Sequence, residues 1–423
     1  MAAGRDRRRG AQPARVTAAW QPLVVVTEWG AHGALPLGLL LVVLAAAGLL
    51  YRRALARASS LSIATLAGVV AVALAAAWCS PILFSSDVYA YAAYGELARL
   101  GLDPYAHAPP GLRDALLQDA AWQWRPSTFP ICVYGPAFVG LARAIVGALA
   151  PLGTLAQLDG LRLAASAALL SIVPLAFAAY GGDRAAKLRA AATIALNPPA
   201  VWCAAEGHND AIALAIVLAG FAVARRGFFG TGAAIVAFSG LVKAPAALAA
   251  VAFGALQPRA RLGAAIGIAL AVLFSVPLLF GVGTRLAPHG QYAPQASLQA
   301  IAAPWSPLAA IVAAGTVCVA LAAAGIVRLR RGDNAGWIWL GIGAWALVPN
   351  PYPWYGIWLI ALAAIAPHSR AATAAILLSF SSLLRYVPDA VAVPGPAGTV
   401  ALGVAATLPM LMLLPGWYNE RLT

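Results

Sequence analysis

A carboxylate and several phenols follow directly on an apolar segment of this chain. Residues 61–78 are almost all apolar, whereas 85–105 reads SSDVYAYAAYGELARLGLDPY. On a helix, Asp87, Tyr91 and Tyr94 share one face at i, i+4 and i+7. Such a carboxylate can take the proton of an attacking hydroxyl, as one inverting sugar transfer requires, while the phenols position a substrate. The alternative is structural, because Ser-Ser-Asp before a helix also suits an N-terminal cap.

Glu96 is the second carboxylate of this stretch. It lies nine residues after Asp87, which is roughly 180° around an ideal helix with 3.6 residues per turn. We keep Glu96 as a candidate substrate contact and expect it to matter less for the reaction than Asp87.

A second polar group stands directly before another apolar run, in the sequence CAAEGHNDAIALAIVLAG. Glu206, His208, Asn209 and Asp210 occupy four of five consecutive positions. Ionisable residues at a membrane boundary are candidates for function. Asn or Asp can instead cap the following helix. One histidine with scattered acids is weak support for a metal site, so we predict no obligatory metal and no cofactor.

Two basic residues stand in otherwise apolar surroundings. Lys243, in LVKAPAAL, is one of only two lysines, and a buried ammonium is costly unless it is paired or hydrated. It can bind a phosphate oxygen, or its side chain can extend to the interface. Arg385, in SLLRYVPDAV, raises the same question.

An aromatic cluster, NPYPWYGIWLIAL, covers residues 350–362. It is either a belt at the membrane interface or a platform for a sugar and an isoprenoid tail. The belt is the simpler interpretation of Trp358, and the platform suits Trp354 and Tyr355.

The composition indicates an integral membrane protein. The 423 residues are 62% hydrophobic and only 10% charged, with a mean hydropathy of +0.81, so charged side chains are too few to cover a soluble surface. The apolar runs are continuous, which favours helices over a β-barrel. The net charge of +14 follows from basic clusters between these runs, which is typical of cytoplasmic loops and not of nucleic-acid binding. These clusters lie at 5–9, 52–57, 183–189, 224–226, 259–262 and 328–331.

The sequence therefore predicts an all-α polytopic bundle of about 11–13 transmembrane helices, with a large outer loop after the second. We divide it into a basic N-terminal segment, 1–33, a transmembrane domain, 34–415, and a cytoplasmic tail, 416–423. The first outer loop, with juxtamembrane helices, is 81–134. Residues 134–150 carry Arg143 and are expected to form a re-entrant or juxtamembrane helix. The apolar runs lie at 34–51, 61–80, 161–180, 188–205, 209–224, 262–282, 306–327, 335–350, 353–367, 371–388 and 396–415, with 230–256 interrupted at Lys243–Pro245.

The ordered set of motifs resembles the polyprenol-phosphate-mannose-dependent α-mannosyltransferases of actinobacteria, which are multi-span enzymes of the GT-C class. The motifs are SSDVYAYAAYGELARLGLDPY, VYGPAF, NPPAVWCAAEGHND, LVKAPAAL and NPYPWYGIWLIAL. The resemblance implies a GT-C fold in the bacterial cytoplasmic membrane, with the active site on the outer face. It implies that Asp87 is the general base and that His208, Asn209, Asp210 and Lys243 border the donor site.

The same resemblance implies the substrates. The donor is a polyprenyl-phosphate sugar, usually of mannose, and the acceptor is a glycan or glycolipid. A base beside a lipid donor must lie at the membrane surface, which explains a carboxylate directly after an apolar segment. The rival hypothesis is a transporter or flippase of lipid-linked sugars, which broken helices and inverted repeats would favour. The sequence shows the helix break at Lys243 but no convincing inverted repeat.

Overall fold

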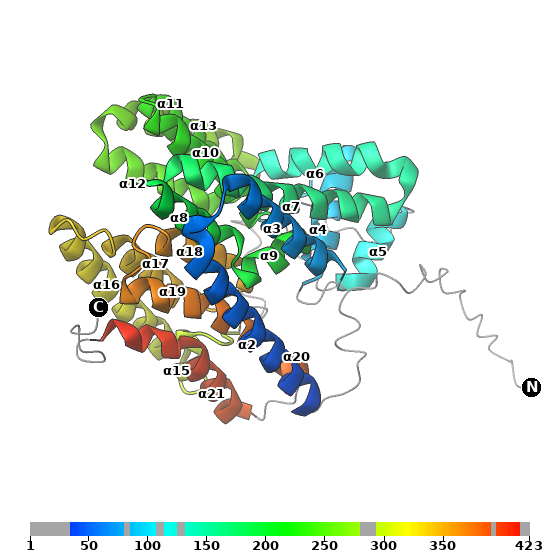
Figure 1. The fold of residues 1–423 in the computed structure, drawn as a ribbon. Helices are drawn as coiled ribbons and strands as arrows, with labels where there is room; N and C mark the ends of the chain where they lie inside the picture. Colours follow the sequence, from blue (N-terminus) through cyan, green and yellow to red (C-terminus); the bar gives the residue numbers. More distant parts are fainter. Residues whose placement is uncertain are drawn as a thin grey trace, which may run out of the picture.

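The computed structural model describes residues 34–79, 85–106, 114–124, 132–279, 293–390 and 395–414. Over these ranges the fold is all-α and contains no strand, which confirms the predicted fold class. Figure 1 shows the helices gathered into one bundle around the chain's central segments. The expected segments 1–33 and 416–423 lie outside the described residues.

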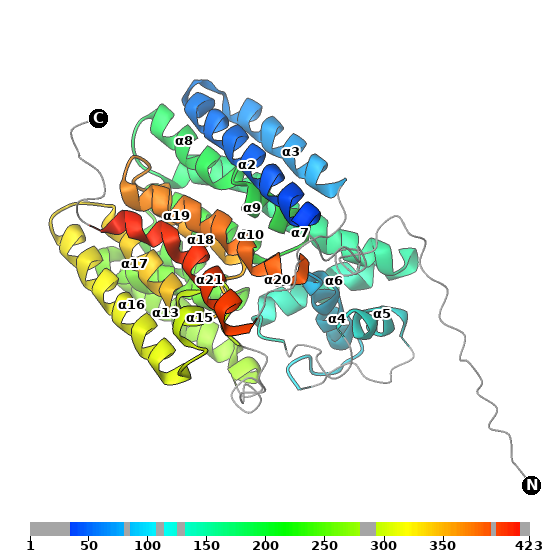
Figure 2. The same cartoon turned by 90° about the horizontal axis from the view of Figure 1, so that it is seen from below.

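The first half of the bundle places two short helices beside longer ones. In Figure 2, α4 and α5 lie together at one side of the bundle, beside α6. Helix α4 packs on α6, and α10 packs on both α7 and α11. The helices are α2 (Ala34–Arg57), α3 (Ile63–Trp78), α4 (Asp87–Arg99), α5 (Ala115–Trp124), α6 (Pro136–Leu149), α7 (Thr154–Ala179), α8 (Arg184–Ala195), α9 (Pro198–Ala205), α10 (Asp210–Arg225) and α11 (Phe229–Phe238).

In the second half, α12 and α13 pack on α11, whereas α16 packs on α17 and α18 packs on α19. Figure 2 shows α2, from the start of the chain, alongside α8 and near α19. The helices are α12 (Leu248–Leu256), α13 (Arg261–Phe274), α15 (Leu298–Ala302), α16 (Pro307–Arg330), α17 (Gly336–Ala346), α18 (Gly356–Ala363), α19 (Arg370–Ser381), α20 (Val387–Ala390) and α21 (Gly395–Thr407).

Several helices are apolar and long enough to cross a membrane. Within the described ranges three pass on length and composition: Thr154–Ala179, Pro307–Arg330 and the stretch Gly395–Leu413. Helices α9 and α10 pass only as a pair, bent by 113° at the residues between them. Five further apolar helices are shorter, so the expected number of 11–13 crossings stays a prediction.

Proline and asparagine account for the division of one expected span. The run 188–205 folds as α8 and α9, which meet at Asn197 and Pro198. The Asn197 side chain accepts a hydrogen bond from the Ala200 N–H and so caps α9. Pro198 has no N–H to donate and suits the first helical position.

The predicted break at Lys243 is confirmed. Helix α11 ends at Phe238 and α12 begins at Leu248, with short 3₁₀ turns between them. Lys243 itself is extended, with φ −144° and ψ 110°. Helix α6 has 14 residues, fewer than the roughly 20 that a crossing needs, so its juxtamembrane or re-entrant placement stays a prediction.

The side of the membrane on which each loop lies can be tested directly. Asp103, after α4, and Arg330, at the end of α16, are both exposed. Because basic clusters face the cytoplasm, a cysteine at position 103 should react with an impermeant maleimide added outside. A cysteine at position 330 should react only after permeabilisation.

The labelling requires replacement of the exposed native Cys79 by serine. The Cys79→Ser protein without an added cysteine gives the background. Reaction of positions 103 and 330 from the same side would contradict the predicted topology.

Candidate active site

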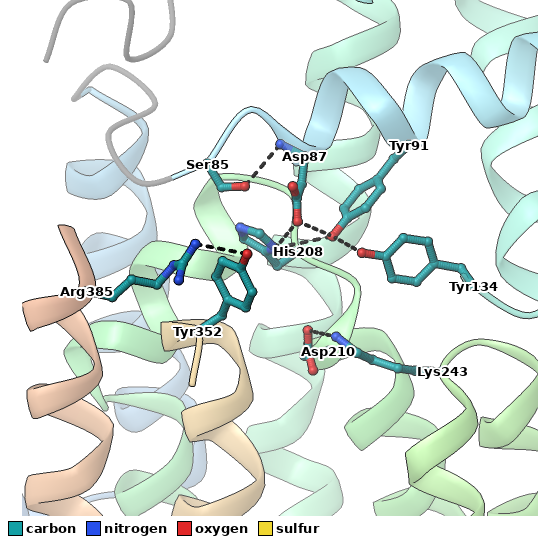
Figure 3. A network of polar contacts seen from close by, with 9 residues as sticks. All are labelled: Ser85, Asp87, Tyr91, Tyr134, His208, Asp210, Lys243, Tyr352 and Arg385. Carbon is teal, nitrogen blue, oxygen red and sulfur yellow. Dashed lines mark hydrogen bonds and ion pairs between the residues drawn. The ribbon is translucent and has the colours of Figure 1, made fainter. Parts of the chain in front are cut away.

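Asp87 stands at the first position of α4, with its carboxylate turned toward other side chains. The Ser85 hydroxyl accepts a hydrogen bond from the Asp87 N–H at 3.1 Å. The Asp87 Oδ2 atom accepts from the Tyr91 hydroxyl at 3.3 Å, one helical turn further on. The N-cap residue of α4 is Ser86, whose side chain makes no capping hydrogen bond, and the side-chain contact of Asp87 is with Tyr91. The capping interpretation of Asp87 is therefore wrong, and its carboxylate is directed into the site (Figure 3).

His208 meets this carboxylate from the break between α9 and α10. Its Nδ1 atom lies 3.8 Å from Asp87 Oδ2 and 3.3 Å from the Tyr91 hydroxyl. The Tyr91 hydroxyl is also 3.1 Å from that of Tyr134, the residue just before α6. Figure 3 shows these four side chains converging from three parts of the sequence.

Close packing of α4 on α6 allows this convergence. A Cβ atom at Gly95 would lie 2.6 Å from the backbone of Ala142 on α6, so only glycine fits there without a shift. The Tyr91 ring then packs edge-on against Tyr134 and Phe138, with centroid distances of 4.9 and 5.1 Å.

Buried polar groups of α7 hold the break before His208. The Arg162 Nε–H donates to the Ala205 carbonyl at 2.8 Å, and the Ser166 hydroxyl donates to the Ala204 carbonyl at 3.3 Å. These carbonyls lie at the C-terminal end of α9, where the last carbonyl groups of a helix have no partner within the helix, and the Ala204 carbonyl also accepts from the Gly207 N–H. Gly207 then turns the chain with φ +94°, a conformation that glycine adopts most easily.

A buried ion pair forms the second part of the site. Lys243 Nζ lies 2.5 Å from Asp210 Oδ2, and the two side chains are 11% and 3% exposed. The Trp358 indole N–H donates to the other oxygen of Asp210 at 2.8 Å. The Lys243 ammonium also lies 4.9 Å from the centre of the Tyr355 ring.

An aromatic stack links His208 to Arg385. The His208 imidazole stacks on the Trp354 ring at 4.0 Å, and Trp354 stacks on Tyr352 at 4.4 Å, with interplanar angles of 16° and 15°. The Arg385 guanidinium lies 3.8 Å from the Tyr352 ring centre and also donates to the Tyr352 hydroxyl at 2.9 Å. The guanidinium also donates to the neutral side chains of Asn350, at 2.8 Å, and Gln295, at 3.1 Å.

The structure brings most of the predicted residues together, and it places some differently. The Glu96 carboxylate pairs with Arg99 on its own helix and does not join the cluster around Asp87. Tyr94 packs against Tyr134 at a centroid distance of 6.2 Å. Asn209 is fully buried, and its side-chain amide makes no hydrogen bond within the described residues.

Two interpretations of single residues are corrected. Trp358 does not face outward as a belt residue, because its N–H is bonded to Asp210. Asp210 is not a cap, because both of its oxygens bind side chains. Tyr134 and Tyr352 were missed as site residues, although each lies within a motif, VYGPAF and NPYPWYG, whose glycine and prolines signal a turn.

Burial sets the electrostatics of Asp87. It raises the pKa of the carboxyl group to about 6, although hydrogen bonding by Ser85 and the positive charge of Lys243 act in the opposite direction. A carboxyl group with this pKa accepts a proton more readily near neutral pH than an ordinary aspartate does. Among the described residues no three His, Cys, Asp or Glu side chains are placed to hold a metal ion.

An all-α membrane bundle with a carboxylate, cations and stacked aromatic rings at its helix breaks has the features of an integral membrane glycosyltransferase. The chain belongs to the alpha-(1->6)-mannopyranosyltransferase family, because the family model described as the N-terminal domain of this enzyme matches residues 7–259. Asp87, His208, Asp210 and Lys243 all lie inside the matched region, and Arg385 lies beyond it.

Two curated relatives are similar over different shares of the chain. Alpha-(1->6)-mannopyranosyltransferase A of Mycobacterium tuberculosis is 29% identical over 363 residues, which is 74% of this chain and 68% of the relative. The protein of that name from Corynebacterium glutamicum is 29% identical over 177 residues, which is 40% of this chain and 34% of the relative. No solved structure matches the chain significantly.

Gly207 offers a test of how the break supports the site. A Cβ atom there would lie 3.1 Å from Val88, the neighbour of Asp87, and φ is +94°. Gly207→Ala should cost about 1–2 kcal/mol in backbone strain and should also displace Val88. We expect a lower melting temperature together with a large loss of sugar transfer.

Gly332→Ala is the matched control. Gly332 has φ +80° with nothing within 4 Å of an added Cβ atom. The Gly332→Ala variant should show the backbone strain without the loss of sugar transfer. Equal activity of the two variants would contradict a positioning role for Gly207.

Proposed function

We propose that this protein transfers a mannosyl residue from a polyprenyl-phosphate donor to a glycan or glycolipid acceptor at the outer face of the membrane, with Asp87 as general base. The family membership supports mannosyl transfer. The donor, the inverting course and the roles of the side chains are our inference from the geometry.

One observation carries the choice of base. Of the three carboxylates Asp87, Glu96 and Asp210, Glu96 pairs with Arg99 and Asp210 pairs with Lys243. Within the described residues Asp87 has no Lys or Arg partner, and the His208 Nδ1 atom lies 3.8 Å from its carboxylate. A carboxylate without a neutralising cation, with a pKa raised by burial, is the best proton acceptor of the three.

The reaction follows from these roles. Asp87 takes the proton of the acceptor hydroxyl while the hydroxyl oxygen attacks the anomeric carbon. The bond between that carbon and the phosphate oxygen breaks, and its electron pair leaves with the phosphate. The relatives are named for an α product, so an inverting transfer requires a β-linked donor. Tyr91 and His208 position the carboxylate through their contacts with it.

Arg385 is the stronger candidate for the leaving phosphate. The contacts described for its guanidinium are with the neutral side chains of Gln295 and Asn350 and with Tyr352, and none of them cancels its charge. A guanidinium can bind phosphate with two parallel hydrogen bonds and stabilise the developing charge. Lys243 is already paired with Asp210, and we assign it a supporting role at the donor site.

The aromatic stack suits the sugar and the start of the lipid. Trp354 and Tyr352 lie between His208 and Arg385, that is, between the proposed base region and the proposed phosphate partner. The convergence of these groups on one cluster favours a transferase over the alternative, a transporter or flippase of lipid-linked sugars.

Replacement of Asp87 tests the proposal. Asp87→Asn keeps the shape of the side chain, but its amide cannot accept the proton. We expect normal expression and donor binding, with transfer reduced about 10²–10⁴-fold. The measurement is transfer of radiolabelled mannose from polyprenyl-phosphate mannose in membranes.

Glu96→Gln is the matched control. It removes an equivalent charge from the same helix, away from the cluster, and should reduce transfer far less. Nearly normal transfer by Asp87→Asn would exclude Asp87 as the base.

The pH dependence of transfer provides a separate test. Asp87 acts as a base only when ionised, so activity should be present above about pH 6 and lost as the pH falls through that value. Ser85 hydrogen bonding lowers this pKa, so Ser85→Ala should shift the acid limb of kcat/KM to higher pH. Ser85→Thr keeps the hydroxyl and should not shift it. If neither Ser85→Ala nor Ser85→Thr shifted the acid limb of the pH profile, the assignment of Asp87 as the titrating base would be contradicted.

A further inference from the structure

A separate pocket of about 290 Å³ opens beside the C-terminal end of α2. Its walls come from the end of α2, from α8, from the end of α18, from the middle of α19 and from the residues between α18 and α19. Leu55, Ile376 and Pro367 supply apolar surface, and Arg189 and His368 supply nitrogen atoms.

The charge of Arg189 is not balanced within the pocket. Its Nη1 atom lies 2.5 Å from His368 Nε2, and no carboxylate pairs with it in the described part of the chain. A guanidinium has five N–H donors, and this contact uses one of them. Arg189 is half-buried and lines the pocket, so its guanidinium is available to a ligand there.

The surroundings add positive charge. Basic side chains occur at the end of α2 and the beginning of α8, and the Arg184 guanidinium donates to the Leu61 carbonyl between α2 and α3. Asp183, the acid of this region, caps α8 by accepting from the Ala186 N–H. His368 directly precedes the N-terminus of α19, whose partial positive charge also favours an anion.

The walls are fixed in place by buried contacts. The Tyr51 hydroxyl of α2 donates to the Thr193 carbonyl of α8 at 2.6 Å. The Tyr180 hydroxyl, after α7, donates to the Ala361 carbonyl of α18 at 2.6 Å. The helices that line the pocket are therefore held together by the packing of the bundle, and the connection from α18 to α19 adds Pro367 and His368.

This pocket is distant from the site of Asp87. His368 precedes α19 and Arg385 follows it, 17 residues later in the chain, a separation of roughly 25 Å along a helical path. The packing of α2 along α19 is consistent with this separation. Phe380 of α19 lies against Tyr51 of α2, whereas Ile376 lines the pocket together with Leu55. The two sites thus lie toward opposite ends of α19.

We propose that this pocket binds a phosphate group, and specifically the phosphate of an anionic membrane lipid whose chain lies on the apolar wall. The Arg189 fork matches two phosphate oxygens. The aliphatic side chains beside it have no polar group to offer a free anion but suit an acyl chain. Basic pockets between membrane helices attract the anionic lipids of the cytoplasmic leaflet.

The test uses the full-length protein purified in a neutral detergent. Phosphatidylglycerol, phosphatidylcholine and inorganic phosphate are titrated separately, and binding is followed by native mass spectrometry and by the melting temperature. We expect phosphatidylglycerol to bind more tightly than phosphatidylcholine, and Arg189→Ala to weaken its binding about tenfold or more.

Arg330→Ala is the matched control. Arg330 is exposed at the end of α16, outside the pocket, so its replacement removes the same charge and should leave lipid binding unchanged. Leu55→Trp fills the pocket without altering charge and should weaken phosphatidylglycerol binding as well. If Arg189→Ala does not fold, Arg189→Lys, which keeps the charge but loses the fork, should show a smaller loss.

The outcomes separate the sources of the phosphate. Equal binding of phosphatidylglycerol by the wild type, Arg189→Ala and Leu55→Trp would overturn the proposal. Binding of inorganic phosphate that Arg189→Ala abolishes, without preference for the lipid, would support the phosphate site and overturn the lipid as its source. A variant that loses lipid binding should still show measurable sugar transfer. Failure of the lipid-binding proposal is therefore distinguishable from failure of the proposed reaction.

Discussion

The buried ion pair between Lys243 and Asp210 is the constraint on which the site depends. Each member stands at a helix break, Asp210 at the start of α10 in the pair bent by 113° and Lys243 between α11 and α12. A charge buried in an apolar bundle is costly unless a partner compensates it, and loss of one partner leaves the other charge uncompensated. The two breaks must therefore meet. Trp358 adds a third segment to the pair through its bond to Asp210. His208, two residues before Asp210, is thereby held near Asp87.

Pairing also determines which charges remain available for chemistry. Lys243 pairs with Asp210, and Arg99 pairs with Glu96, so the negative charge of each of these carboxylates is compensated. Asp87 receives hydrogen bonds, no Lys or Arg pairs with it within the described residues, and burial raises its pKa. Arg385 is the converse case, because amide and phenol oxygens hold the guanidinium without cancelling its charge. In the proposed reaction the Asp87 carboxylate and the Arg385 cation, joined by stacked rings, serve the two ends of the breaking sugar–phosphate bond.

The sequence predicts the fold class and most of the site, but it does not predict the partners. Continuous apolar runs require helices. Rare polar residues within such runs must converge, so Asp87, His208, Asp210 and Lys243 could be chosen from the sequence as candidate site residues. Partners depend on packing between distant segments. Lys243 pairs with a residue 33 positions away, and Trp358 bonds to one 148 positions away. Lys243 therefore appeared free to bind phosphate, and Trp358 appeared suited to the membrane interface. Glu96 was identified by its residue type, although a local partner, Arg99, was already present in the sequence.

Two arginines lie toward opposite ends of α19, Arg189 on α8 and Arg385 just after α19, and they illustrate how neighbours determine what a cation can do. The side-chain hydrogen bonds described for them go to imidazole, amide and phenol groups. Arg385 lies on Tyr352, at one end of a stack that leads through Trp354 to His208 and the carboxylate of Asp87. A phosphate held there lies within the same cluster as a base. Arg189 faces an imidazole and aliphatic side chains, and no carboxylate lines its pocket. A phosphate held there has no general base of this kind beside it, so the geometry of this pocket suits binding without transfer.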